Sequence, residues 1–454
     1  MNRFLFTTLP TNDLGLLTRS LPIARELTER GHKILFCSPA QAPSRLIADA
    51  GFENLVPRHP LYDLMGADQK LKALVEFIAS GSHKQRYGNL FHFLKQLLPA
   101  IPVKFAPNTR EVWNFDHTAA VMGMLHEGFV HANCEALRHT ILDSGADVVV
   151  DFLNPFAVIA ARTLQKPLVT VIQGNFHPES GGFIWWKSLP ATLPTTVPTM
   201  NKVLARYRLP PLRVFEELCV GDLTLSVGTR ETDPLPETAK VTYIGAVLWQ
   251  KENAQPPGWF ATLSEEKPVV WVYSGNPRYA GTNDIFDSMI VLEACIAALA
   301  NEEIQVVLTT GHHPLPKELL PLPANFLHES YVPGLAMAER SDVLIHHGGY
   351  GSCQTGLYAG KPAVIMPTFS ERESNARRIV ALGAGAIVNV DSTPGKKHVH
   401  VDELRATVRR VLSDPSFRQN ARQVGEKLRR YGGALQAADL IEQFTRTGNV
   451  RERP

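Results

Sequence analysis

The residues best suited to chemistry lie close together, between positions 341 and 378. An apolar run at 343–345 leads into two histidines, His346 and His347, and then into Gly-Gly-Tyr-Gly-Ser at 348–352. Glycines let a backbone turn tightly and approach a ligand without a Cβ clash. A helix that begins at such a turn directs free N–H groups and its positive dipole end to one point. With His347 and Ser352 as further donors, the segment predicts a site for an anion such as a diphosphate.

The alternative for this segment is a tight strand-to-helix turn that binds nothing. A Gly-Gly-X-Gly turn alone would favour that alternative. Here two histidines precede the glycines, and Gly-Lys-Pro at 360–362 follows the expected helix. This combination favours the anion site.

The elements around this segment follow a strand–helix–strand order. Apolar runs at 4–8 and 33–37 flank a stretch in which apolar residues recur at helical spacing. Such a unit requires parallel strands, because a helix carries the chain back between them. The order restarts in the second half, with a helix at 285–300 and a helical tail at 401–444. Further strands are expected at 147–152, 168–172, 268–273, 304–309, 343–345 and 363–366. The fold class is therefore α/β, with parallel sheets covered by helices.

Prolines and glycines divide the chain. The stretch 234–267 contains four prolines and two glycines and predicts a linker between two α/β halves. Residues 180–213 hold five prolines and the pair Trp185-Trp186, so they form an excursion that lines a binding cleft or packs as a surface loop. The apolar stretches 87–105 and 184–186 indicate either a pocket wall or core.

Composition excludes several classes of function. The formal net charge is only +2, from 46 basic and 44 acidic residues, which argues against nucleic acid as the main partner. The five cysteines lie far apart without a CxxC pair, which argues against a disulfide framework or structural zinc and favours a cytoplasmic location. No stretch reaches the ~18 apolar residues that a membrane span needs, so none is expected.

At the histidine–glycine segment the chain resembles a known family. The sequences HHGGYGS, AGKPAVIMP and SN at 346–375 are similar to the donor-binding signature of the UDP-glycosyltransferase superfamily, in particular its bacterial natural-product enzymes. The resemblance implies the GT-B architecture: an acceptor domain at 1–233, a linker at 234–267, a nucleotide-sugar domain at 268–431 and a crossing helix at 432–454. It also implies an inverting, metal-independent hexosyltransferase without a cofactor. The donor would be a UDP- or dTDP-sugar, and the acceptor a small apolar or aromatic molecule.

The resemblance assigns donor-binding roles residue by residue. His347 matches the histidine that meets the diphosphate, and Val332 matches the backbone position that reads the pyrimidine edge. The loops that hold the phosphates correspond to Gly349, Gly351 and Ser352 on one side and to Ser274, Gly275 and Asn276 on the other.

Two positions depart from the family pattern. Thr355 stands where an acidic residue binds the ribose, and Glu371-Arg372 replaces the Asp-Gln pair that grips the sugar. Glu371 can still accept hydrogen bonds, whereas Arg372 either favours an acidic sugar or pairs with a neighbouring glutamate.

The general base is the third departure. The family places a histidine or aspartate at the first loop-to-helix junction, and counting along the sequence puts Leu16 there. Leucine cannot take a proton, so Asp13 in the same loop is the first substitute, with a helix or turn cap as its alternative role. His177, after the strand at 168–172, is the second substitute or an acceptor contact.

The missing histidine keeps two other functions open. One is a GT-B epimerase or hydrolase that releases the nucleotide without an acceptor. The other is a nucleotide-sugar-binding homologue without catalysis. The intact glycine segment argues against complete loss of donor binding.

Overall fold

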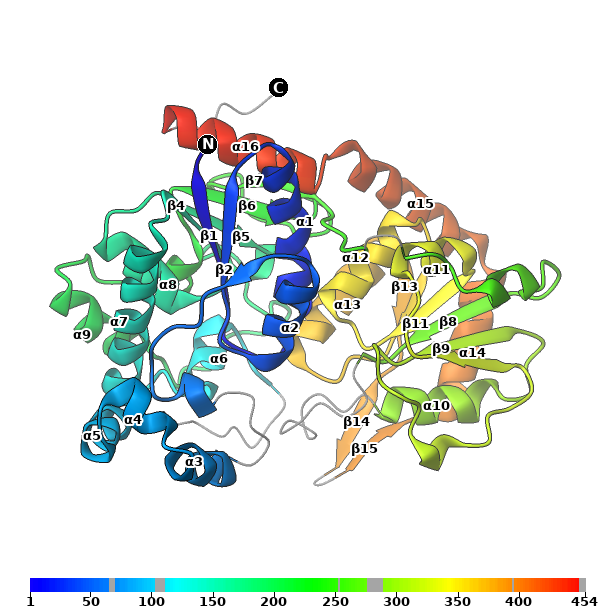
Figure 1. The fold of residues 1–454 in the computed structure, drawn as a ribbon. Coiled ribbons are helices and arrows are strands. Elements are labelled where there is room, and N and C mark those ends of the chain that lie inside the picture. The colour runs from blue at the N-terminus through cyan, green and yellow to red at the C-terminus, as the bar shows by residue number, and fades with distance from the viewer. Residues whose placement is uncertain (65–69, 103–110, 252–253, 276–288, 394–395, 449–454) are drawn as a thin grey trace.

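The computed structural model describes the chain except for residues 65–69, 103–110, 252–253, 276–288, 394–395 and 449–454. Two α/β units lie side by side, each built on a parallel sheet with helices on both faces (Figure 1). Seven strands make the first sheet and six make the second. The expected α/β class with two parallel sheets is therefore confirmed.

The first sheet has the order β3-β2-β1-β4-β5-β6-β7, and neighbouring strands are parallel. Its strands are β1 (Arg3–Thr8), β2 (Lys33–Cys37), β3 (Glu53–Asn54), β4 (Val148–Phe152), β5 (Leu168–Ile172), β6 (Leu223–Val227) and β7 (Thr242–Gly245). β1 and β4 lie at the centre, where helices cover both faces. Central strands of this kind need apolar residues without alternation, which explains the runs that marked them in the sequence.

Helices form two layers over this sheet. One face is covered by α7 (Glu127–Ser144), α8 (Pro155–Thr163) and α9 (Val197–Arg206), and the other by α1 (Gly15–Glu29) and α16 (Ala434–Thr447). The remaining helices are α2 (Gln41–Asp49), α3 (Lys70–Ala79), α4 (Ser82–Tyr87), α5 (Leu90–Ala100) and α6 (Phe115–Val121), with short 3₁₀ turns at Tyr62–Leu64, Gly174–Phe176 and Phe215–Cys219. Each layer encloses its own apolar core.

The second sheet has the order β10-β9-β8-β11-β12-β13 and is also parallel. Its strands are β8 (Val269–Tyr273), β9 (Gln305–Thr309), β10 (Phe326–Glu329), β11 (Val343–His346), β12 (Ala363–Ile365) and β13 (Gly385–Ile387). Its helices are α10 (Met289–Leu299), α11 (Gly334–Arg340), α12 (Tyr350–Tyr358), α13 (Ser370–Ala381), α14 (Val401–Ser413) and α15 (Pro415–Arg430). An antiparallel hairpin, β14 (Val390–Thr393) with β15 (Lys396–Val399), extends this unit.

Part of the predicted linker 234–267 belongs to the first unit. β7 lies within this stretch and forms the edge strand of the first sheet, paired with β6. The strand holds only four residues and ends at Gly245, whose φ is +76°. A strand this short shows little of the hydrophobic pattern that marks a strand. In the sequence, the prolines and glycines of this stretch therefore stood out instead. The segment that connects the two sheets is therefore shorter than 234–267.

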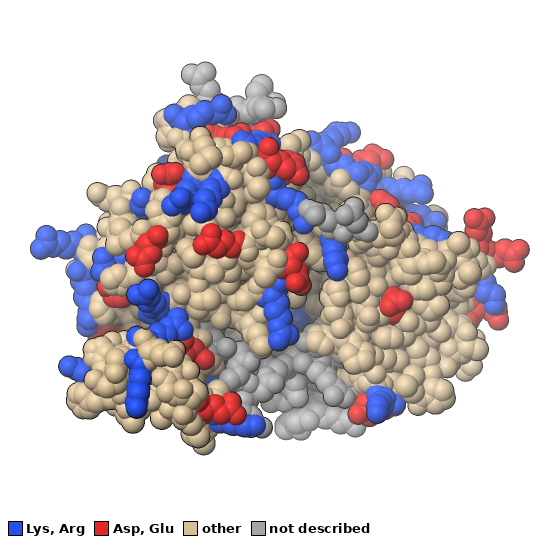
Figure 2. Space-filling model, in the orientation of Figure 1, with Lys and Arg blue, Asp and Glu red and all other residues tan. Residues whose placement is uncertain are grey.

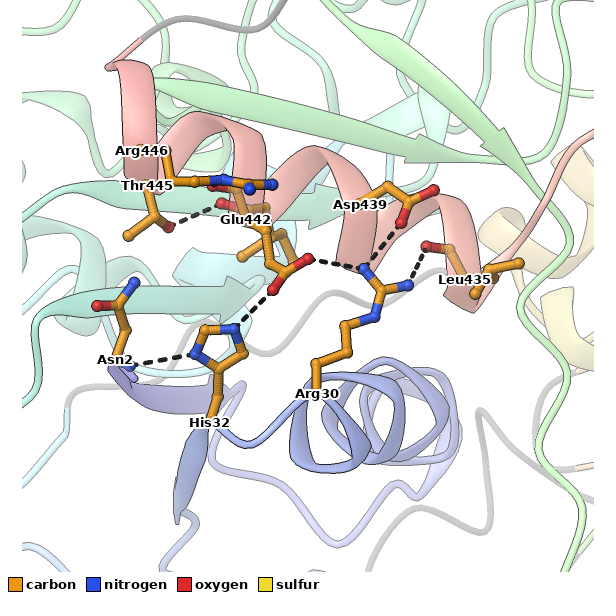
Figure 3. Close-up of polar contacts among 9 residues, drawn as sticks. Asn2, Arg30, His32, Leu435, Asp439, Glu442, Thr445 and Arg446 are labelled. Atoms are coloured by element: carbon orange, nitrogen blue, oxygen red, sulfur yellow. Dashed lines mark hydrogen bonds and ion pairs between the residues drawn. The ribbon is translucent and has the colours of Figure 1, made fainter.

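The last helix, α16, returns to the first unit. Its apolar side packs into the core layer formed with α1. Figure 3 shows the polar part of this contact: Arg30 Nη1 lies 2.8 Å from Asp439 Oδ1 and 3.0 Å from Glu442 Oε2. His32 Nε2 lies 2.8 Å from Glu442 Oε1. The last helix is thus joined to the first helix of the chain, and the segment 415–447 ties the two units together (Figure 1).

Within the part of the chain that the structure describes, no helix is both long and apolar enough to cross a membrane. All five cysteines are buried with free thiols.

Candidate functional site

The histidine–glycine segment forms the turn from β11 into α12, at the boundary between the two units (Figure 1). Gly348 has φ +88°, and a Cβ there would lie 2.6 Å from the carbonyl oxygen of Arg372. Any side chain would therefore push α13 away. Asn375 Nδ2 donates to the carbonyl oxygen of Gly348 over 3.0 Å. The turn is thus clamped against the first turns of α13, which brings segments 346–352 and 371–375 together.

The two histidines are held in neutral form. His346 accepts a hydrogen bond from the N–H of Gly348 through Nδ1, at 3.1 Å, and burial lowers its pKa to about 4. His347 is 7% exposed, and burial together with the charge of Arg372 holds its pKa well below the usual range. Its Nδ1 is buried without a hydrogen-bond partner among the described residues. A neutral imidazole can offer one N–H to an anion, so the residue fits the role of a diphosphate donor.

The N-terminus of α12 is open on one side. Gly351 is exposed, and a Cβ placed there would meet no atom within 4 Å. Ser352 is half-buried in the same turn. Thr355 donates through Oγ1 to the carbonyl oxygen of Gly351 over 2.9 Å. The hydroxyl proton of Thr355 is therefore already donated within α12. Towards a ribose hydroxyl, Thr355 can act only as a hydrogen-bond acceptor. Buried Gln354 has an Oε1 atom that lacks a partner among the described residues.

The opposing loop follows β8. Ser274 is fully buried and Gly275 has φ +74°, so the backbone bends sharply as it leaves the strand. Asn276 lies outside the described residues. The rings of Tyr273 and His347 are 6.2 Å apart, which places this loop beside the histidine turn. The side chain of Val332 is buried just before α11. Only the backbone at this position can therefore contact a nucleotide base.

Glu371 and Arg372 lie in the first turn of α13. Glu371 Oε1 accepts from Asn375 Nδ2 over 2.8 Å, and burial raises the pKa of its carboxyl group. Arg372 Nη1 donates to Thr368 Oγ1 over 2.8 Å, and its charge acts on Glu371 and His347. Glu373 pairs instead with Arg377, at 2.7 Å. Arg372 is therefore held near the histidine turn.

One residue of this site, Arg19, was not anticipated from the sequence. It lies one turn after Leu16 in α1, is 8% exposed, and its guanidinium lies over the ring of Tyr350 at 5.2 Å. When the amide of Gln173 is oriented to satisfy both neighbours, its oxygen accepts from Arg19 at 3.1 and 3.0 Å and its nitrogen donates to Glu371 at 3.3 Å. A chain of polar contacts thus runs from α1 through the end of β5 to α13. Nothing in the local sequence separates this arginine from a surface arginine; its only signal is the three-residue spacing from Leu16.

The candidate bases occupy different places. Asp13 is exposed and accepts from the N–H of Gly15 through Oδ1 at 2.7 Å, so it fixes the start of α1. Its charge also acts on Arg19 and Glu371, which places it on the side of α1 that faces the second unit. Leu16 is half-buried in the first turn of α1 and packs against both core layers. His177 is buried, and its Nδ1 accepts from the N–H of Glu179 in its own loop.

The excursion at 180–213 reaches the second unit. Trp185 Nε1 donates to Ser374 Oγ over 3.1 Å, and Arg377 lies over the ring of Trp186 at 4.2 Å. The segment therefore covers α13, the helix that carries Glu371. The tryptophan pair of the excursion therefore lies at the boundary between the two units, and α9 occupies the second part of the excursion.

Among the described residues, no group of three or more His, Cys, Asp or Glu side chains is arranged to hold a metal ion.

Two parallel α/β sheets side by side, with the last helix returned to the first unit, define a GT-B protein. Solved structures share this fold over the whole chain. The calicheamicin glycosyltransferase CalG4 matches with a TM-score of 0.67 at 21% identity, covering 99% of this chain and 100% of CalG4. The glycosyltransferase VinC, solved in complex with dTDP, matches with a TM-score of 0.65 at 17% identity, covering 98% and 99%.

Sequence comparisons agree with the fold. The family model for the C-terminal domain of erythromycin biosynthesis protein CIII-like proteins matches residues 293–430. The 4'-demethylrebeccamycin synthase of Lentzea aerocolonigenes is 33% identical over 187 residues, which are 41% of this chain and 41% of that protein. The chain spans about half the length of the curated relatives it matches. The C-terminal part of the chain is thus similar in sequence to natural-product glycosyltransferases, and the whole chain shares their fold.

Proposed function

We propose that the protein is an inverting glycosyltransferase that moves a sugar from a nucleoside diphosphate to a small apolar or aromatic acceptor. The observation that carries this proposal is the turn at 346–352. There a glycine backbone, a neutral buried histidine and a helix N-terminus meet at the boundary between the two units. This is the arrangement that binds a diphosphate and stabilises it as a leaving group.

In the proposed reaction, the acceptor oxygen forms a bond to the anomeric carbon while the bond from that carbon to the β-phosphate oxygen breaks. The electron pair of the broken bond stays on the phosphate. His347, Ser352 and the amides at the start of α12 are the donors that would stabilise the new charge. Attack from the face opposite the leaving group inverts the anomeric centre. The acceptor proton passes to a base, for which Asp13 is the first candidate.

The sugar would lie against Glu371, with Gln173 and Arg19 behind it. Glu371 is already bonded to Asn375, so one face of its carboxylate has a fixed direction from which it can accept a sugar hydroxyl. The donor base is uridine or thymidine. The dTDP complex of VinC supports a thymidine nucleotide for a protein of this fold. Thr355, in place of an acid, can give the ribose only a neutral acceptor.

The test is nucleotide release from a panel of UDP- and dTDP-sugars, with and without aromatic and macrolide acceptors, and with and without EDTA. Release that requires an acceptor and persists in EDTA is the expected result. Release without any acceptor would overturn transfer in favour of an epimerase or hydrolase. Saturable binding without release would make the protein a nucleotide-sugar-binding homologue.

A further inference from the structure

A patch of apolar side chains is exposed on α3 and α5, in a corner of the first unit away from both sheets (Figure 1). Seven of the sixteen large apolar side chains exposed among the described residues lie between positions 71 and 101. The patch consists of Leu71 and Val75 on α3 and of Leu90, Phe91, Leu94 and Leu98 on α5. Phe91 and Leu71 are 77% and 76% exposed. Single exposed apolar residues are ordinary, whereas a cluster marks an interaction surface.

The patch exists because the apolar side of α5 is wider than the core that it contacts. At 3.6 residues per turn, its four exposed apolar residues fall within about 100° of the helix circumference. Phe93 and Leu97 lie on the adjoining side of the helix and join Tyr87 in a small core of their own. The four exposed residues lie outside that core. Of the stretch 87–105, expected to form a pocket wall or core, Tyr87, Phe93 and Leu97 lie in this small core, and residues 103–105 lie outside the described residues.

The charge around the patch is strongly one-sided. Residues 70–101 contain five basic residues and one acidic residue. Two of the basic residues are paired, Lys72 with Glu76 and Arg86 with Asp63. Lys70, Lys84 and Lys95 are exposed, and no acidic side chain among the described residues forms an ion pair with them. In Figure 2 this corner is mostly uncharged, with basic side chains scattered over it and a few acidic side chains on its side toward the second unit.

We propose that the α3–α5 patch docks on the surface of an anionic lipid bilayer. Exposed phenylalanine and leucine beside lysines is the composition of elements that lie in the membrane interface. Lysines near such a surface are attracted by its anionic headgroups. A second copy of the chain fits less well, because it would bring the unpaired lysines of two copies together. Resting on the proposed function, this placement would let the first unit take an apolar acceptor directly from the bilayer.

The experiment measures binding of the full-length protein to vesicles, without substrates, so that it does not depend on transferase activity. The wild type is expected to float with vesicles of phosphatidylcholine and phosphatidylglycerol, more weakly with phosphatidylcholine alone, and less as NaCl rises. Phe91→Ser with Leu98→Ser should weaken binding about tenfold or more. Lys84→Gln with Lys95→Gln should weaken it about fivefold for each lysine.

Matched controls carry the same changes elsewhere. Leu142→Ser with Leu435→Ser changes side chains that are 49% and 53% exposed outside the patch, and Lys240→Gln removes an exposed charge. These variants should bind vesicles like the wild type. The lysine variants keep the test valid if circular dichroism shows that the apolar variant fails to fold.

Two results would overturn the proposal. The first is a wild type that does not bind anionic vesicles, or patch variants that bind as well as the controls. The second is a wild-type dimer in light scattering that becomes a monomer in Phe91→Ser with Leu98→Ser, because the patch would then join two copies of the chain.

Discussion

The hydroxyl of Tyr350 lies 2.8 Å from Oδ2 of Asp233, which joins the first residue of α12 to the first unit. The same hydroxyl lies 2.6 Å from the carbonyl oxygen of Val227, at the end of β6. A phenol has one proton and can donate to only one of these oxygens. Burial raises the pKa of Asp233, and its protonated form would supply the second proton. The helix that follows the histidine–glycine turn is therefore anchored across the domain boundary.

Tyr350→Phe tests this anchor. The variant keeps the ring but leaves a buried carbonyl and a buried carboxyl without their partner. We expect the free energy of unfolding to fall by about 1–3 kcal/mol in urea denaturation. Donor affinity, measured by calorimetry, should fall as well, because α12 loses its fixed position. Tyr358→Phe, at the other end of the same helix, is the control and should change neither quantity. Equal losses in both variants would contradict the anchor.

His347→Ala tests the diphosphate donor. Loss of one preorganised donor to a developing anion typically costs about 10²–10³ in rate, so turnover should fall by that order. Because burial and Arg372 hold the pKa of His347 well below its usual range, donor binding to the wild type should not follow a histidine titration between about pH 6 and 8. His139→Ala, an exposed histidine on α7, is the control. Wild-type kinetics in His347→Ala with every donor tried would remove this residue from the site.

Asp13→Asn separates the two roles of this residue. An asparagine oxygen can still accept from the N–H of Gly15, so α1 should begin as before and thermal stability should change little. A base is typically worth about 10²–10⁴ in rate, so turnover should fall by that order while donor affinity stays the same. Turnover unchanged across the pH range would place the base elsewhere, and His177→Ala would be the next variant.

The sequence was most informative for elements whose structure is determined by their own residues and not by distant contacts. The glycine turn at 346–352, the central strands and α1 have distinctive local patterns, and β2 and β5 begin and end at the predicted residues. Edge strands were missed, because β7 and β10 are short and half-exposed or flanked by prolines. Arg19 and Asp233 were missed for a different reason. Each acquires its role only from partners far away in the sequence.

Asp151 predicts how stability depends on pH. It lies at the carboxyl end of β4, where it accepts from Thr7 Oγ1 and from the N–H of Asn154, and burial raises its pKa to about 7. The folded state then binds this proton more tightly than the unfolded state, whose aspartate has a pKa of about 4. Protonation of Asp151 therefore stabilises the folded state. This stabilisation is fully present below about pH 4 and is lost as the pH rises through about 7. The contribution is at most roughly 4 kcal/mol.

Asp151→Asn should therefore flatten the pH dependence, because an amide does not titrate. We expect the free energy of unfolding, measured in urea at pH 5 and pH 8, to fall less between the two pH values in the variant than in the wild type. Asp143→Asn, an exposed aspartate on α7, controls for the loss of a carboxylate and should leave the wild-type difference intact. The same difference in Asp151→Asn as in the wild type would show that Asp151 is ionised throughout this range. Its hydrogen bonds to Thr7 and Asn154 would then outweigh burial.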